Sequence, residues 1–152
     1  TKITSKTYLF LLLLVISALT IIPYLGLTNF HTKGEPREAI VAVSMLQNDN
    51  WILPINNGGD IAYKPPFFHW CIAALSLPAG EVTEFTSRLP SALAAIIMAI
   101  ACVLFFAKRS RNDIAFLASL LLLSGFEVHR AAMASRVDMV LTCFIVLAML
   151  QV

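Results

Sequence analysis

The residues that could do chemistry gather in one polar stretch, Gly34 to Pro66, between segments that are almost purely apolar. It begins GEPREAIVAVSMLQNDNW and closes with DIAYKPP. Two acids and an arginine open it, and a lysine before paired prolines ends it. Loops held between rigid elements carry a large share of functional residues. We therefore expect this loop to hold the reacting groups of a membrane enzyme.

Glu35 has the chemistry of a general base. A carboxylate here could deprotonate an acceptor hydroxyl or amine, or bind a divalent metal ion. The same acid also suits the first turn of a surface helix, where it interacts with the positive end of the helix dipole. In that interpretation Glu35 is a capping acid and Arg37 is its partner on the helix surface. The residues alone leave both interpretations open.

Lys64 stands among Tyr63, Pro65, Pro66 and aromatic residues, with no acid within three positions. A cation in such a rigid frame suits the binding of phosphate as a point charge. The alternative is a lysine whose ammonium reaches the lipid headgroups while its stem lies against apolar surface. The sequence does not separate the two.

Three more charged residues lie where apolar segments begin. Arg136 and Asp138 precede the last apolar run, a depth at which ionisable groups usually face a cavity or each other. An ordinary interfacial ion pair explains them equally well. Arg88 opens another apolar segment and could be either an anchor or a site cation.

Composition sets the class of protein. The chain has 152 residues, of which 59% are hydrophobic and 13% charged, and its mean hydropathy is +0.81. Soluble domains carry about 25% charged residues, so we expect an integral membrane protein. A net charge of +2 gives no indication of nucleic-acid binding. The three cysteines and three histidines have no paired spacing and predict neither a disulfide nor a metal site.

The apolar segments predict an all-α, polytopic transmembrane helical bundle. Spans are expected at about 8–27, 86–107, 114–130 and 139–152, with a long loop over 28–85. The last run is shorter than the roughly 20 residues a spanning helix needs. We therefore expect residues 1–152 to be the N-terminal part of a longer transmembrane module.

The long loop is expected on the outer side of the membrane. Lys2, Lys6 and the cluster KRSR at 108–111 precede or join apolar spans, which places the N-terminus in the cytoplasm by the positive-inside rule. Within the loop, Arg37 to Gln47 has helical apolar spacing, and Phe67 to Leu77 is a short apolar helix. Both are too short to span, so we expect them to lie along the membrane surface.

The run from GEPREAIV to YKPPFFHW, followed by EFTSRLPSALAAI and SRVDMVLTCF, resembles the polytopic GT-C glycosyltransferases of family 39. These include aminoarabinose transferases that modify lipid A, and relatives of the protein O-mannosyltransferases. The resemblance covers nearly the whole chain from residue 8 onward. It implies a cell-envelope enzyme of the bacterial inner membrane. The enzyme would move a sugar from a polyprenyl-phosphate donor to a lipid, glycan or protein acceptor on the outer face.

The resemblance also assigns roles. It makes Glu35 and Asp138 the catalytic acids, with cations to stabilise the leaving phosphate at Arg37, Lys64, Arg88 and Arg136. Gly34 departs from the pattern, because the family has an aspartate there that is the usual candidate base. At the position of Tyr63 the family often has a glutamate, which binds a metal ion in some relatives. The sequence leaves open whether this protein uses a divalent metal.

Two alternatives belong to other classes. One is a non-catalytic or transport protein whose loop only packs against the spans, although transporters more often place ionisable groups mid-membrane in paired repeats. The other is an inactive relative of the transferases, which the glycine at position 34 suggests. In each case membrane lipids are partners.

Overall fold

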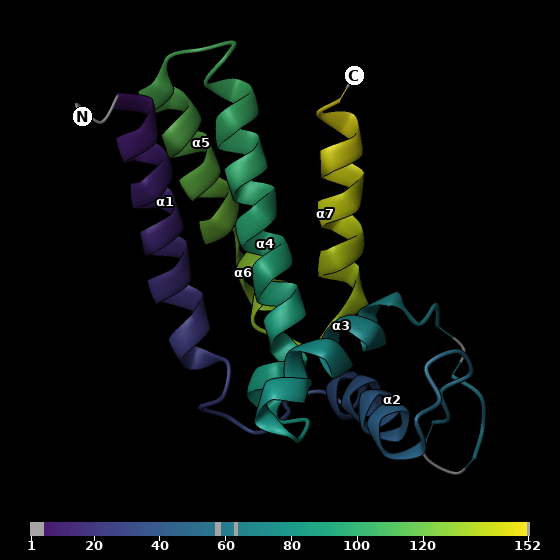
Figure 1. The fold of residues 1–152 in the computed structure, drawn as a ribbon. Helices are drawn as coiled ribbons and strands as arrows, with labels where there is room; N and C mark the ends of the chain where they lie inside the picture. Colours follow the sequence, from purple (N-terminus) through teal and green to yellow (C-terminus); the bar gives the residue numbers. More distant parts are fainter. Residues whose placement is uncertain (1–4, 57–58, 63, 152) are drawn as a thin grey trace.

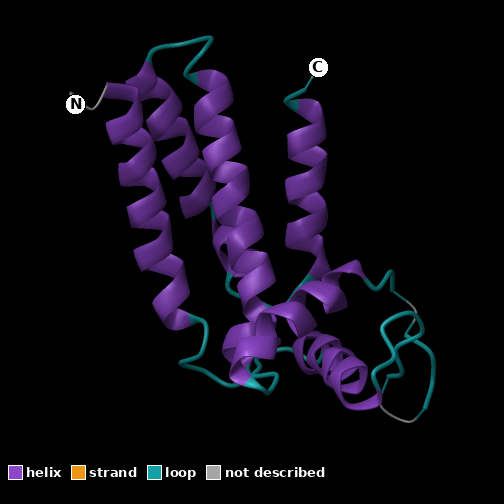
Figure 2. Ribbon diagram, viewed as in Figure 1, coloured by secondary structure: helices purple, strands orange, loops and turns teal. Residues whose placement is uncertain are grey.

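The computed structural model describes residues 5–56, 59–62 and 64–151, and these form helices with no strand (Figure 2). Lys2, Tyr63 and Val152, on which the sequence interpretation also drew, lie outside the described residues. The α-helices are α1 (Ser5–Ile21), α2 (Gly34–Asn48), α3 (Phe67–Ser76), α4 (Glu84–Phe106), α5 (Asn112–Ser124), α6 (Phe126–Ala132) and α7 (Val137–Met149). Short 3-10 turns, η1 (Ile22–Tyr24) and η2 (Leu77–Ala79), extend α1 and α3.

The long helices run side by side, and α2 and α3 lie across one end of them (Figure 1). Among the described residues, two segments are long and apolar enough to cross a membrane, Thr7–Tyr24 with 18 residues and Glu84–Phe106 with 23. The pair α5 and α6 meets the same criterion as one broken span. The prediction of an all-helical fold is thereby confirmed for the described residues, with two or three helical segments long and apolar enough to span a membrane.

The segment expected to cross as one span, 114–130, is bent in the structure. Helix α5 ends at Ser124, and α6 continues at an angle of 68° to it. Gly125 forms the corner in an extended conformation. A Cβ there would lie 3.2 Å from the carbonyl oxygen of Leu122, so glycine permits this close approach of the backbone.

Helix α4 is the centre of the bundle and contacts α1, α2, α3, α5, α6 and α7. Its packing surface is made of small side chains, and Ala92, Ala95 and Ala99 are completely buried. Small residues let helix backbones approach closely, as is usual between membrane helices. Thr83 starts α4 with a capping box to Thr86, which fixes where the helix begins.

Helix α2 is amphipathic, as predicted. Its buried face consists of Glu35, Glu38, Ala39, Val41, Ala42 and Met45, which recur at helical spacing. The helix ends at Asp49, which has a left-handed backbone (φ 49°). Two acids therefore lie on the face of α2 that is turned to the rest of the protein, where charges need partners.

Candidate functional site

Glu35 forms a buried ion pair with Arg88, which lies 53 positions away at the start of α4. The Nε of Arg88 donates to Oε1 of Glu35 at 2.9 Å. Each residue is only 1% exposed. Burying two charges is tolerated when geometry and further hydrogen bonds compensate both.

The remaining donors of Arg88 hold the loop between η1 and α2. Its guanidinium donates to the carbonyl oxygens of Leu25, Thr28 and Asn29 at 2.7, 2.8 and 2.9 Å. It also lies over the ring of Phe30, 5.4 Å from the centroid. Arg88 was predicted to contact phosphate. The structure instead gives most of its donors to the protein itself.

The carboxylate of Glu35 is equally occupied. It accepts from the backbone N–H groups of His31 at 2.9 Å, Thr32 at 3.3 Å and Ser135 at 3.1 Å. Burial alone would raise the pKa of Glu35, but the bonds from Arg88, His31 and Ser135 outweigh it and lower the pKa. Glu35 therefore stays ionised and joins α2, α4 and the segment after α6. Whether Glu35 also acts as a general base stays a prediction from the sequence.

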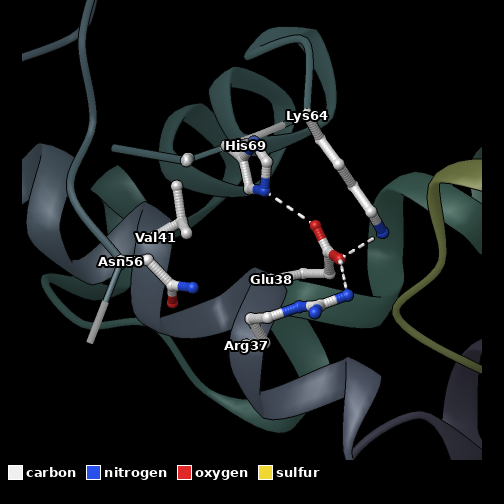
Figure 3. Close-up of a pocket in the computed structure, with 7 residues that line it drawn as sticks. Arg37, Glu38, Val41, Asn56, Lys64 and His69 are labelled. Atoms are coloured by element: carbon white, nitrogen blue, oxygen red, sulfur yellow. Dashed lines mark hydrogen bonds and ion pairs between the residues drawn. The ribbon is translucent and has the colours of Figure 1, made fainter. Parts of the chain in front are cut away.

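A second buried carboxylate, Glu38, lies one turn further along α2 (Figure 3). Lys64 Nζ donates to its Oε1 at 2.5 Å, and His69 Nε2 lies 2.7 Å from its Oε2. Arg37 approaches the same carboxylate at 4.0 Å. The cation that the sequence left without a partner thus has one, on another element of the fold.

Around these groups lies a small cavity of about 80 Å³, lined by Arg37, Glu38, Val41, Asn56, Ala62, Lys64 and His69. Glu38 and His69 are buried, whereas the side chains of Lys64 and Arg37 are 44% and 56% exposed. Burial would raise the pKa of Glu38, but the bonds from His69 and Lys64 lower it overall. Glu38 is therefore a charged group facing three basic ones.

Sequence reasoning missed Glu38 and His69. A signal for Glu38 was present, because it follows Glu35 by three positions and shares the helix face of Val41 and Met45. An acid on an apolar face is expected to have a buried partner. No comparable signal identifies His69, since the contact depends on how α3 packs against α2.

A larger cavity, about 610 Å³ in volume, opens beside Glu35 and Arg88. Basic side chains line it, namely His31, Arg88, His129, Arg130 and Arg136, and Glu35 is the one acid among the described residues that do so. Apolar and aromatic groups complete the wall, including Tyr24, Phe126, Met133 and Ala134. The cavity thus combines basic side chains with an apolar wall. Two of its arginines are already paired, Arg88 with Glu35 and Arg130 with Glu127.

Arg136 and Asp138 lie where α7 begins. Their closest charged atoms are 3.9 Å apart, and the side chains are 37% and 79% exposed. Ser91 on α4 fixes this backbone, because its hydroxyl donates to the Arg136 carbonyl and accepts from the Arg136 N–H. Arg136 faces the large cavity and, with Asp138, a neighbouring hollow of about 240 Å³. Both side chains are therefore accessible to a ligand.

The six predicted site residues therefore fall into two groups. Glu35, Arg88 and Arg136 line the large cavity, and Asp138 stands beside Arg136. Arg37 and Lys64 belong to the small cavity around Glu38. Among the described residues, no three His, Cys, Asp or Glu side chains gather as ligands for a metal ion.

Gly34, where the resembling family has an aspartate, is the first residue of α2. A Cβ at this position would meet nothing closer than the Thr32 hydroxyl, at 3.9 Å. The fold therefore has room for a side chain here, and the glycine is not required by packing.

Searches against protein-family models, curated proteins and solved structures found no match to this chain.

Proposed function

We propose that this protein is a membrane glycosyltransferase of the GT-C type that takes a sugar from a polyprenyl-phosphate donor. The observation that carries the proposal is the cavity of about 610 Å³, which joins arginine and histidine side chains to an apolar wall. Its volume lies within the roughly 300–1,000 Å³ of small-molecule sites. The resemblance described from the sequence supports the same donor.

The large cavity matches the two chemical halves of such a donor. Arg136 supplies positive charge for the phosphodiester, which gains charge as it leaves. Arg130 is already paired with Glu127 at 2.6 Å, so Arg136 is the principal cation of this proposal. Tyr24, Phe126 and Met133 offer apolar surface for the first isoprene units. Arg88 acts indirectly, because it fixes the loop that forms one wall.

The acid best placed to act on an acceptor is Asp138. Its side chain is 79% exposed and lies 3.9 Å from Arg136, beyond hydrogen-bond distance. Among the described residues no hydrogen bond reaches its carboxylate, whereas the carboxylate of Glu35 is hydrogen-bonded to Arg88. In the proposed reaction an acceptor hydroxyl or amine loses its proton to Asp138 and attacks the anomeric carbon. The bond from that carbon to the phosphate oxygen breaks, and polyprenyl phosphate leaves with the electron pair. The acceptor would be a lipid, glycan or protein on the outer face of a bacterial inner membrane.

The experiment measures transfer of a labelled sugar from a polyprenyl-phosphate donor by the purified protein in lipid nanodiscs. Arg136→Ala and Asp138→Asn should each lower the rate about 100-fold or more. Arg111→Ala is the matched control, since this arginine lies at the other end of the bundle and forms an exposed ion pair with Asp113. Equal transfer by both site variants and the control would refute the assignment. Donor binding without transfer by the wild type would identify an inactive relative.

A further inference from the structure

A groove of about 320 Å³ lies between α1 and α5 and has no part in the reaction above. Ile16, Ser17, Thr20 and Ile21 line it from α1, and Leu120 and Leu123 line it from α5. Ser17, Ile21 and Leu123 are buried, whereas Thr20 is exposed. This α1–α5 groove therefore lies at the surface of a segment that is apolar and long enough to cross a membrane.

The hydroxyl groups of the α1–α5 groove are bonded to their own helices. Ser17, Thr20 and Ser124 each donate to a carbonyl oxygen three or four positions earlier, at 3.0, 2.8 and 3.1 Å. Such bonds leave the hydroxyl hydrogens unavailable to a ligand. None of the described residues that line the groove carries a permanent charge. The groove therefore favours a hydrocarbon chain over a polar headgroup.

The α1–α5 groove leads into the large cavity. Ser124 and His129, on the two sides of the bend between α5 and α6, line both spaces. On the first span, Ile16 belongs to the groove and Tyr24 to the large cavity. The helical segment between them rises about 12 Å, which is close to half of the hydrocarbon thickness of a bilayer, about 30 Å. The groove thus has the length of a lipid chain in one leaflet.

We propose that the α1–α5 groove binds the isoprenoid tail of a lipid phosphate whose headgroup lies in the large cavity near Arg136. The tail passes the bend between Ser124 and His129 and continues toward Ile16. A single groove between two helices suits one chain, whereas a phospholipid has two. The choice of an isoprenoid phosphate rests on the proposed function, and the position of its tail rests on the continuity of the two spaces.

The test compares two radiolabelled ligands that differ in tail length, in equilibrium binding to the purified protein in detergent. Undecaprenyl phosphate is the leaving group of the proposed reaction, and dimethylallyl phosphate has a tail of a single isoprene unit. Thr20→Phe places a ring in the groove, so it should weaken binding of undecaprenyl phosphate about tenfold or more, the effect of losing about two buried CH₂ groups. Binding of dimethylallyl phosphate, which reaches only the large cavity, should stay unchanged.

Two control variants separate the filled groove from other effects of the change. Thr20→Val removes the hydroxyl but keeps the shape of the groove, and Leu19→Phe places the same ring on an exposed position of α1 outside it. Both should bind the two ligands as the wild type does. Leu120→Trp fills the groove from the opposite wall and should reproduce the effect of Thr20→Phe. Thermal unfolding of each variant establishes that it is folded.

Photo-crosslinking distinguishes an isoprenoid from an ordinary membrane lipid. A polyprenyl phosphate with a diazirine in its tail should label peptides of α1 and α5 in the wild type. Excess phosphatidylglycerol should leave this label in place, and Thr20→Phe should remove it. Loss of the label to phosphatidylglycerol would identify a general phospholipid site and overturn the proposal.

Unchanged binding of undecaprenyl phosphate to Thr20→Phe and Leu120→Trp, or equal weakening of both ligands, would also overturn the proposal. Neither outcome bears on transfer at Arg136 and Asp138, which the activity assay decides separately. Conversely, binding that depends on the groove in a protein without transferase activity would leave this inference standing and refute the proposed function.

Discussion

Arg88 shows at the scale of one residue how the candidate site is held together. Its guanidinium carries one charge and donates to three backbone carbonyls as well as to Glu35. Removing it leaves a buried carboxylate without its cation, which typically destabilises a protein by about 3–5 kcal/mol. We expect Arg88→Ala to lose stability of that order, measured by thermal or denaturant unfolding in nanodiscs.

The matched control for Arg88→Ala is Arg111→Ala, which removes an arginine from an exposed pair with Asp113. Exposed ion pairs contribute little to stability, so this variant should unfold like the wild type. Equal stability of Arg88→Ala and the wild type would show that the Glu35 network is not needed for the fold.

Glu35 and Glu38 predict how stability depends on pH. Hydrogen bonds outweigh burial and hold the pKa of both carboxyls below the ordinary value of 4.5. A carboxyl with a lowered pKa in the folded state stabilises fully above its unfolded pKa, and the contribution is lost as pH falls through the folded pKa. Unfolding temperatures should therefore decline below about pH 4.5. In Glu35→Gln, which is less stable at neutral pH, this decline should be smaller, and a decline as steep as in the wild type would contradict the assignment.

The contacts of Lys64 show why the partners of the charged residues could not be predicted from the sequence. No acid lies within three positions, so the sequence indicated an unpaired cation. Its partner Glu38 is 26 positions away and reaches it because α2 and α3 pack together. Likewise the chemistry of Glu35 was identified from its type and position, but its bond to Arg88 spans 53 positions. Local patterns identify which residues are polar in an apolar setting, and packing decides what they contact.

At the scale of the element, apolar periodicity predicted most helices to within a few residues. Helix α2 was expected over Arg37 to Gln47 and runs from Gly34 to Asn48. The bend between α5 and α6 was not predicted, because apolar residues continue on both sides of Gly125. One glycine within an apolar run is weak evidence for a break. The structure supplies the reason in the close approach of Gly125 to the Leu122 carbonyl.

Gly34 allows a prediction about α2. It is the first residue of the helix and has room for a side chain. An aspartate there would interact with the positive end of the helix dipole, an effect of about 0.3–1 kcal/mol. We expect Gly34→Asp to raise the free energy of unfolding by that amount, and under the proposed function to increase sugar transfer.

Gly34→Ala separates the two causes of that gain. Alanine supplies the helix propensity of a non-glycine residue without a charge. Stability and transfer of Gly34→Ala should therefore lie between those of the wild type and Gly34→Asp. Unchanged transfer in Gly34→Asp would show that position 34 does not face the reaction.

For the whole molecule, composition predicted a helical membrane protein, and the structure has helices long and apolar enough to cross a membrane. The orientation expected from the charges stays a prediction. Figure 1 shows both termini and the loop that holds residues 108–111 at one end of the long helices, with α2 and α3 at the other. The two groups of predicted site residues nevertheless line separate cavities. Sequence order could not foresee this, because Glu35 and Glu38 are neighbours on one helix and face different surroundings.

This arrangement makes a prediction about sidedness. The positive-inside rule places the basic loop at 108–111 in the cytoplasm, so α2, α3 and both cavities should face outward. Exposed positions at the two ends, Ser110 and Asp60, can each be changed to cysteine after Cys71, Cys102 and Cys143 are replaced by alanine. A membrane-impermeant maleimide should label Asp60→Cys in spheroplasts and label Ser110→Cys only after the membrane is permeabilised. Labelling of both from one side would contradict the bundle's crossing of the membrane. Labelling of Ser110→Cys alone would reverse the orientation and place the cavities in the cytoplasm, where a donor presented on the outer face could not reach Arg136.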